Sequence, residues 1–189
     1  MSAQAIASII LNFWFGEPSS PSYGRYKDFW FQSTPELDGQ IRKQLEPVYQ
    51  KAIKGELDSL SETPAGSLAL VIILDQFPRN MYRGTPQAFA SDAKALKVAK
   101  EAVEKKFDQD LLPMQRMFLY LPYEHSENTE DQEQSVKLFK NLGDELALKY
   151  AIEHRDAITQ FGRFPHRNAI LGRESTPEEI RFLGGKATP

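Results

Sequence analysis

The sequence predicts an all-α fold in which seven to nine helices stack as antiparallel hairpins. Three observations support this prediction. Apolar residues recur at helical spacing over 6–14, 37–52, 96–103, 136–142 and 147–161. Threonine–proline pairs offer a hydroxyl N-cap followed by proline at the first helical position. The one strand-like run neither alternates apolar and polar residues nor has a partner, so no sheet is predicted.

The first two predicted helices each carry a single apolar stripe. The first stripe runs from Ile6 to Trp14. The second covers 37–52 and is followed by Gly55, a natural stop. Pro47 lies inside the second stripe, and we expect a kink or a break there because proline clashes with the preceding helical turn.

The later helices are defined by their start and stop residues. The four threonine–proline pairs are Thr34-Pro35, Thr63-Pro64, Thr85-Pro86 and Thr176-Pro177. The apolar run 68–74 is too short to span a bilayer, and we predict a central helix that is buried on all sides. Ser91 is expected to cap the helix that carries 96–103. The last two stripes end at Gly143 and Gly162.

The composition excludes several classes of protein and site. The 189 residues include no cysteine, so this chain has no disulfides, thiolate metal sites or cysteine nucleophiles. Its 23 basic and 26 acidic residues give a net charge of −3, whereas a nucleic-acid surface needs a basic excess. No linker divides the chain, so we expect residues 1–189 to form a single domain. No targeting signal is predicted, and we expect a cytoplasmic protein without nucleic-acid or membrane partners.

Three segments have an unusual composition for connections in a helical protein. The segments 75–84, 120–127 and 161–175 combine arginines, carboxylates, histidines and aromatic residues, and we predict that they are loops. The windows 77–86 and 161–173 hold five arginines and no lysine, while the rest of the chain has 13 lysines and five arginines. Because arginine suits partly buried contacts with anions, these motif segments are the candidate functional region.

Two interpretations of the motif arginines remain open. In the first, they stabilise the fold by pairing with carboxylates and capping helix ends. The candidate carboxylates are Asp75, Glu124, Glu127 and Glu174. In the second, they form a clamp for an anionic ligand. Asp75 ends the most apolar helix, so we expect its carboxylate to be partly desolvated and paired with Arg79, four residues on.

The three histidines differ in their expected roles. His125 and His166 lie in motif segments with carboxylates nearby in sequence, and they are candidates for acid–base chemistry. His154 lies on the apolar stripe of its helix, and we expect a core residue with satisfied hydrogen bonds. No His-x-x-x-His or Glu-x-x-His spacing occurs, so neither a metal site nor a cofactor is predicted.

The motif segments resemble a known family. The signatures are LDQFPRN at 74–80, LPYEHSE at 121–127 and GRFPHRNAILGR at 162–173, and the similarity includes FWFG at 13–16. They are similar to the bacterial domain-of-unknown-function family 924 over nearly the whole chain. This resemblance implies an all-α fold like that of tetratricopeptide-repeat proteins, but it implies no reaction. The chain departs from the family at Leu60, where tryptophan is usual, and we expect only a packing change.

The leading functional hypothesis is a pocket for a small anionic molecule, with acid–base chemistry if the protein is an enzyme. The predicted proton-transfer residues are Glu124, His125 and His166. The predicted ligand-binding residues are Asp75, Arg79, Asn80, Arg83, Tyr123, Arg163, Arg167 and Asn168. The predicted aromatic walls are Tyr82, Tyr123 and Phe164. The hypothesis requires the three motif segments to converge on one cleft.

Two alternatives come from different classes of function. One is a tetratricopeptide-like interaction module, in which a groove of stacked hairpins binds a peptide or protein. The other is a purely structural role, in which buried arginine–carboxylate networks join the hairpins. The sequence predicts no oligomeric state.

Overall fold

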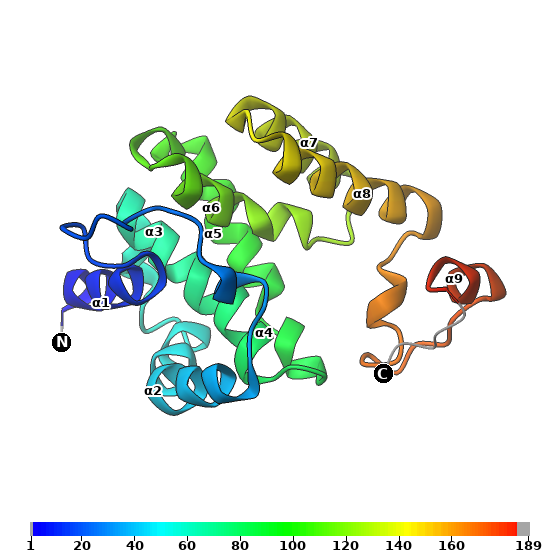
Figure 1. The fold of residues 1–189 in the computed structure, drawn as a ribbon, viewed down its shortest axis with the longest axis horizontal. Helices are drawn as coiled ribbons and strands as arrows, with labels where there is room; N and C mark the ends of the chain where they lie inside the picture. The colour runs from blue at the N-terminus through cyan, green and yellow to red at the C-terminus, as the bar shows by residue number, and fades with distance from the viewer. Residues whose placement is uncertain (1, 185–189) are drawn as a thin grey trace.

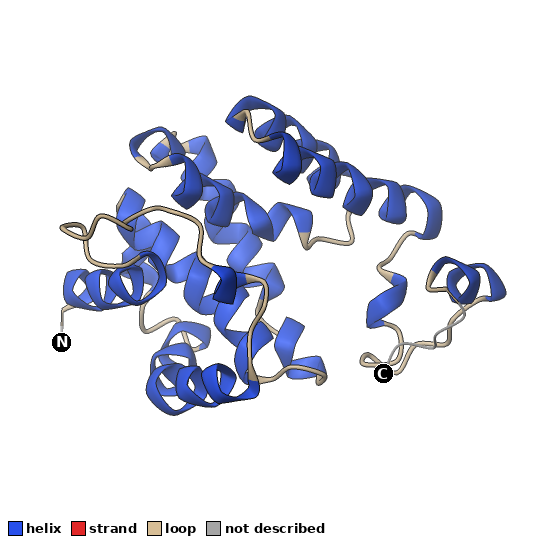
Figure 2. Ribbon diagram, viewed as in Figure 1, coloured by secondary structure: helices blue, strands red, loops and turns tan. Residues whose placement is uncertain are grey.

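The computed structural model describes residues 2–184, and these residues form an all-α fold (Figures 1 and 2). No β-strand occurs in this part of the chain, which confirms the predicted fold class. The α-helices are α1 (Ala3–Phe15), α2 (Pro35–Ile53), α3 (Pro64–Val71), α4 (Phe77–Met81), α5 (Asp92–Glu104), α6 (Pro113–Glu124), α7 (Thr129–Leu142), α8 (Glu145–Phe161) and α9 (Pro177–Phe182). The shorter helical segments are η1 (Asp28–Trp30), η2 (Asp58–Glu62), η3 (Ile72–Gln76), η4 (Pro86–Phe89), η5 (Phe107–Asp110) and η6 (Pro165–Arg167). None of the described helices is long and apolar enough to cross a bilayer.

The helices α3 and α4 are joined by η3 into one continuous rod at the centre of the fold. Its residues 66–78 are buried, which confirms the prediction of a helix covered on all sides. The helices α1, α5 and α6 pack against α3, while α2 packs against α4 (Figure 1). The helix α2 is not broken at Pro47, one of the two outcomes that we expected there, because it continues from Pro35 to Ile53.

The predicted threonine caps are present at three of the four positions. The hydroxyls of Thr34, Thr63 and Thr176 each accept a hydrogen bond from the backbone N–H three residues further on. Thr85 precedes the 3₁₀ segment η4 without capping it, and its hydroxyl donates to the Tyr82 carbonyl at 2.7 Å. The local sequence therefore defines these helix starts before any tertiary contact is considered.

The helices α6, α7 and α8 form consecutive hairpins. Asn128 caps α7 by accepting hydrogen bonds from two backbone N–H groups, and α7 ends at Gly143, whose φ is 79°. That left-handed conformation favours glycine, and Asp144 caps α8 directly afterwards. Because α7 packs against both α6 and α8, the hairpins stack in chain order, an arrangement compatible with tetratricopeptide-like stacking.

The chain beyond α8 forms η6 and α9, which lie to one side of the other helices in Figure 1. The main apolar cluster runs from Ile6 in α1 to Ala151 in α8. A separate small cluster contains Ala157, Ile158 and Phe164. With so little apolar burial, the C-terminal segment depends on polar contacts, which are described below with the third motif.

Gly66 is the helical glycine with the least room for a side chain. A Cβ atom there would lie 2.1 Å from the Leu60 carbonyl oxygen. We expect Gly66→Ala to lower the free energy of unfolding by about 1–3 kcal/mol, because α3 and η2 must move apart. Gly39 in α2 is the control, since a Cβ atom there meets nothing within 4 Å and Gly39→Ala should stabilise by about 0.5–1 kcal/mol. Urea denaturation measures both, and equal effects would contradict the steric argument.

Candidate functional site

A cavity of about 600 Å³ lies against the rod, the segment around η1 and the helices α6 and α8. Its polar lining consists of Gln32, Ser33, Gln76, Arg79, Asn80, Arg83, Glu124, His125, Asp144 and His154. Its apolar wall includes Trp30, Phe31, Met114, Met117, Leu121, Phe139, Leu146 and Tyr150. Small-molecule sites usually measure about 300–1,000 Å³, so the cavity has the size of a ligand site.

The first motif begins in a locally widened turn of the rod. Pro78 has no N–H, so the Leu74 carbonyl lacks its usual helical donor. The segment η3 is π-helical, and the Phe77 N–H bonds to the Ile72 carbonyl, five residues back. The Ser91 hydroxyl donates to the Leu74 carbonyl at 2.5 Å. The chain therefore stays helical through Pro78, and residues 75–81 are not the loop that the sequence predicted.

The second motif is also mostly helical. Residues 120–124 complete α6, and His125 follows as its C-cap. Gln132 on α7 closes this helix end, because its side-chain amide donates to the carbonyls of Glu124 and Ser126 at 2.7 Å each and to that of Tyr123 at 3.3 Å. Glu124 and His125 are thus held by α7 at the wall of the cavity.

Asp75 and His125 form a hydrogen-bonded pair across the two motifs. Asp75 has no exposed surface, and its Oδ1 lies 2.7 Å from His125 Nδ1. Asp75 Oδ2 accepts a hydrogen bond from Gln76 at 2.6 Å. Burial alone would raise the pKa of Asp75, but the Arg79 guanidinium and His125 hold it below its usual range. Asp75 is therefore an ionised carboxylate inside the protein.

His125 is neutral in this environment. Burial and the nearby Arg79 guanidinium lower its pKa, although Asp75 opposes the shift. Because an ionised carboxylate only accepts hydrogen bonds, the short contact assigns the ring proton to Nδ1. Nε2 then carries a lone pair, and within residues 2–184 no hydrogen bond uses it. A carboxylate-oriented imidazole of this kind can accept a proton.

Glu124 lies beside this pair and, unlike the Asp75 carboxylate, keeps its proton. It is 6% exposed, and burial together with the Asp75 charge raises its pKa to about 8. Its Oε1 lies 3.3 Å from His154 Nδ1, which also contacts the Tyr150 carbonyl at 2.8 Å. His154, predicted to be a core residue, is instead a partly exposed side chain of the cavity wall.

The two cavity arginines both have carboxylate partners. Arg79 forms a two-pronged contact with Asp92, at 2.8 and 2.9 Å, and lies 3.2 Å from Asp75. Arg83 donates to Asp38 at 2.9 Å but keeps 59% of its side chain exposed. Arg79 is therefore neutralised on two sides, whereas Arg83 retains a solvent-accessible face.

Arg167 from the third motif reaches the same carboxylate without lining the cavity. Its Nη1 lies 3.6 Å from Asp92, and its guanidinium is held between the rings of Phe89 at 4.7 Å and Phe164 at 4.6 Å. Burial and the neighbouring Arg79 lower its pKa to about 10, so it remains a cation at neutral pH. The contact joins η6 to the start of α5.

The remainder of the third motif holds the C-terminal segment together. Arg163 pairs with Glu179 of α9 at 2.7 and 2.9 Å, and Asn168 donates to the same carboxylate at 3.2 Å. Arg173 pairs with Glu127 at 2.7 and 3.0 Å, and Glu127 also accepts from the Phe164 backbone N–H. These contacts supply the polar support that the small apolar cluster lacks.

Comparison with known proteins places the chain in a family. The family described as "Bacterial protein of unknown function (DUF924)" matches residues 10–186. The chain belongs to the DUF924 family. A solved structure, titled as that of the protein of unknown function ATU0120 from Agrobacterium tumefaciens, is 38% identical and superposes with a TM-score of 0.88. The match covers 98% of this chain and 100% of that chain. No curated protein matches.

The DUF924 signatures divide into two groups in the structure. The first two signatures line one cavity, whereas the third does not. The prediction that all three segments converge on one cleft is therefore wrong, and a pocket hypothesis can rest only on the first two. The predicted residues on the wall are Arg79, Asn80, Arg83, Glu124 and His125, with Asp75 directly behind His125. The predicted residues away from the wall are Tyr123, Arg163, His166, Arg167 and Asn168, as are the predicted aromatic walls Tyr82 and Phe164. Among residues 2–184, no three His, Asp or Glu side chains are grouped to hold a metal ion.

Several residues of the candidate site were not predicted from the sequence. Asp38 and Asp92, which pair with Arg83 and Arg79, lie 45 and 13 residues from these partners. His154 lies on an apolar stripe, which concealed its contact with Glu124. One feature of the sequence could have drawn attention to Asp92. It is an acidic residue in the first turn of α5, just after Ser91.

Proposed function

We propose that the cavity binds a small anionic molecule and performs acid–base chemistry on it. The observation that carries the proposal is that Glu124 and His125, adjacent at the end of α6, face one cavity with different proton occupancy. Glu124 holds a proton, whereas His125 Nε2 does not. A group that can donate a proton therefore lies beside a group that can accept one. Pairs of ionisable groups whose environments separate their pKa values are typical of acid–base sites.

His125 serves as the general base in this proposal. Asp75 fixes the tautomer through Nδ1 and stabilises the imidazolium that forms when Nε2 takes a proton. Asp75 acts as a positioning residue, because it is fully buried and does not line the cavity. Arg79 holds Asp75 in its ionised form.

Glu124 serves as the proton donor, and its neutral form accommodates an anion. A carboxylic acid with a pKa of about 8 is protonated at neutral pH and can donate a hydrogen bond to a carboxylate or phosphate oxygen. Arg83 supplies the cation, since Asp38 occupies only Nε and Nη2 and most of the side chain is exposed. An anion bound there would meet one neutral acid and one guanidinium.

The third motif is assigned a structural role. Arg163, Asn168 and Arg173 direct their side chains to Glu179 and Glu127, and none of them lines the cavity. We propose that these contacts fix the C-terminal segment to α8 and to the residues after α6. This assigns a purely structural part to one signature and a chemical part to the other two.

Thermal-shift measurements with acetate, butanoate and inorganic phosphate test anion binding. A ligand that binds the native state raises the melting temperature by mass action, so at least one probe should stabilise the wild type. Arg83→Gln should weaken that binding about tenfold or more, because it removes the accessible cation. Arg42→Gln is the control, since Arg42 also forms an exposed pair, with Glu46 at 3.5 Å, but does not line the cavity. Equal responses of the two variants would contradict the proposal.

A further inference from the structure

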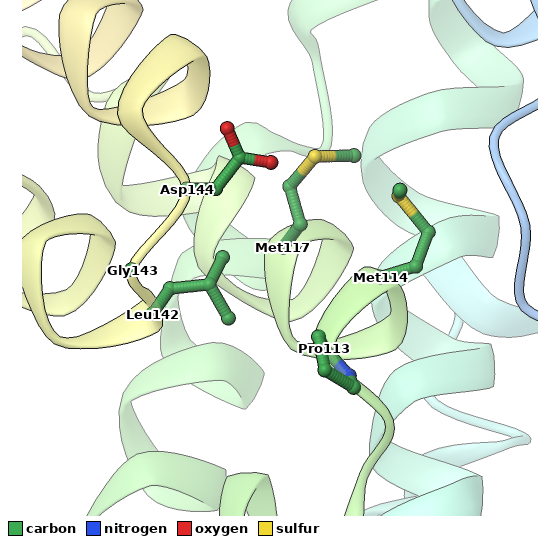
Figure 3. A pocket seen from close by; sticks show the side chains of 6 residues that line it. All are labelled: Pro113, Met114, Met117, Leu142, Gly143 and Asp144. Carbon is green, nitrogen blue, oxygen red and sulfur yellow. The ribbon is translucent and has the colours of Figure 1, made fainter.

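A second pocket adjoins the cavity at the other end of its apolar wall. It measures about 330 Å³ and lies between the start of α6 and the turn that joins α7 to α8. Met114, Met117 and Asp144 line both spaces, so the two pockets are adjacent. In the view of Figure 3, Met117 of α6 lies between Met114 on one side and Leu142 and Asp144 on the other. The smaller pocket is called the side compartment below.

The side compartment has the chemistry of a chain-binding pocket. Besides the shared residues, it is lined by Pro113, Leu142 and Gly143, none of which carries a polar side chain. Its single charged group is Asp144, whose Oδ1 already accepts hydrogen bonds from the backbone N–H groups of Leu146 and Ala147 at 3.0 Å each. A polar group of a ligand would lose its hydration there without gaining a cation or a free donor.

Methionine is suited to walls that a flexible chain passes. Its unbranched thioether has several rotatable bonds, so Met114 and Met117 can adjust their positions at little cost. A rigid ring system would need a fixed slot, whereas a chain can follow the bend between the two compartments. The partition between them is thus adaptable on its α6 side.

The mouth of the larger cavity is also apolar. Four of the ten exposed large hydrophobic side chains of residues 2–184 line this cavity: Tyr26, Phe31, Leu146 and Tyr150. Exposed apolar residues gathered at one opening indicate a ligand that brings apolar surface with it. The polar lining of the same cavity includes Glu124 and Arg83.

We propose that the ligand is an amphipathic carboxylate with an unbranched hydrocarbon chain, whose chain passes Met117 and ends in the compartment beneath the α7–α8 turn. This inference rests on the proposed function, in which Glu124 and Arg83 bind the carboxylate group. The chain is enclosed by Leu121, Met114, Met117 and Leu142. Chain length is then the property that the site selects.

Isothermal titration of the full chain with butanoate, hexanoate, octanoate, decanoate and dodecanoate, each below its micelle-forming concentration, tests the proposal. Each added methylene that is buried should raise the affinity about fourfold. The increase should continue through octanoate and stop once the side compartment is full. An affinity that does not change with chain length would overturn the proposal.

Two variants test where the hydrocarbon chain of the ligand lies. Met117→Phe and Leu142→Phe fill the compartment from opposite walls, and Met117→Leu is the volume-conserving control. Each Phe variant with a cooperative melting transition should bind decanoate at least tenfold more weakly. Leu142→Phe, which does not line the larger cavity, should bind butanoate like the wild type. Two substitutions on different elements keep the test available if one of them fails to fold. Unchanged decanoate binding in a folded Phe variant would show that the hydrocarbon chain does not enter the side compartment.

The outcomes separate this inference from the proposed function. If short carboxylates bind and Arg83→Gln weakens them, but chain length and the Phe variants have no effect, only the chain-binding inference is wrong. If no carboxylate of any length binds, the anion site itself is wrong and the inference falls with it.

Discussion

Asp75→Ala is expected to lower the free energy of unfolding by roughly 3–5 kcal/mol, the usual cost of removing one partner from a buried ionic network. Asp75 is completely buried and meets Gln76, Arg79 and His125 within 3.2 Å. Its loss would leave the buried donors of Gln76 and His125 without an acceptor and would leave Asp92 as the carboxylate partner of Arg79. Urea denaturation monitored by circular dichroism gives the difference.

Two variants control the Asp75 experiment. Asp75→Asn keeps the size of the side chain and one acceptor. Its free energy of unfolding should therefore lie between those of the wild type and of Asp75→Ala. Asp58 forms a 2.8 Å contact with Lys94, but 59% of its side chain is exposed. Asp58→Ala should therefore cost less than about 1 kcal/mol. If Asp75→Ala lowers the free energy of unfolding no more than Asp58→Ala does, the buried network does not stabilise the fold more than an exposed ion pair.

Glu124→Gln is expected to stabilise the protein increasingly as the pH rises. The folded pKa of Glu124, about 8, lies above its ordinary value of 4.5, so the folded state holds a proton that the unfolded chain releases between these values. Stability contributed by the neutral acid is fully present below pH 4.5 and is lost as the pH rises through about 8. At about 1.4 kcal/mol per pH unit, the loss has an upper bound of roughly 5 kcal/mol. Glutamine cannot ionise and avoids it.

Denaturation at about pH 5, 7 and 9 measures this linkage. The advantage of Glu124→Gln over the wild type should be smallest at the lowest pH and largest at the highest. Glu133→Gln, on the exposed face of α7, is the matched control that removes one solvent-accessible carboxylate. A difference between wild type and Glu124→Gln that stays constant with pH would show that Glu124 ionises normally in the folded protein.

The same ionisation predicts how anion binding depends on pH. Above about pH 8 the site gains the Glu124 charge, so the affinity of the wild type for butanoate should fall about tenfold per pH unit. Glu124→Gln should keep its affinity over that range, because its amide remains neutral and can still donate a hydrogen bond. A parallel fall in both proteins would assign the effect to another group.

Local sequence rules predicted most of the fold. The threonine caps at Thr34, Thr63 and Thr176 and the glycine stop at Gly143 depend on neighbouring residues alone, and each was confirmed. The first two motifs, predicted to be loops from their composition, are mostly helical although each contains a proline. In the first, a π-helical turn and the distant Ser91 hydroxyl compensate for Pro78, and a single sequence does not display either compensation.

The candidate site was predictable in part. Motif composition identified Asp75, Glu124 and His125, because uncommon residue types were concentrated there. Which arginine pairs with which carboxylate depends on how helices far apart in sequence pack, as for Arg83 and Asp38, 45 residues apart. His154 was misjudged because periodicity distinguishes the face of a helix but not a core from the wall of a cavity.

The amide of Gln132 has a consequence for cooperativity. One side chain of α7 bonds three carbonyls at the end of α6, so that end cannot fray alone. Opening the backbone around Glu124 and His125 requires the first turns of α7 to separate from α6 at the same time. Glu124 and His125 therefore belong to one unfolding unit that spans both helices, and their relative positions persist for as long as that hairpin stays closed.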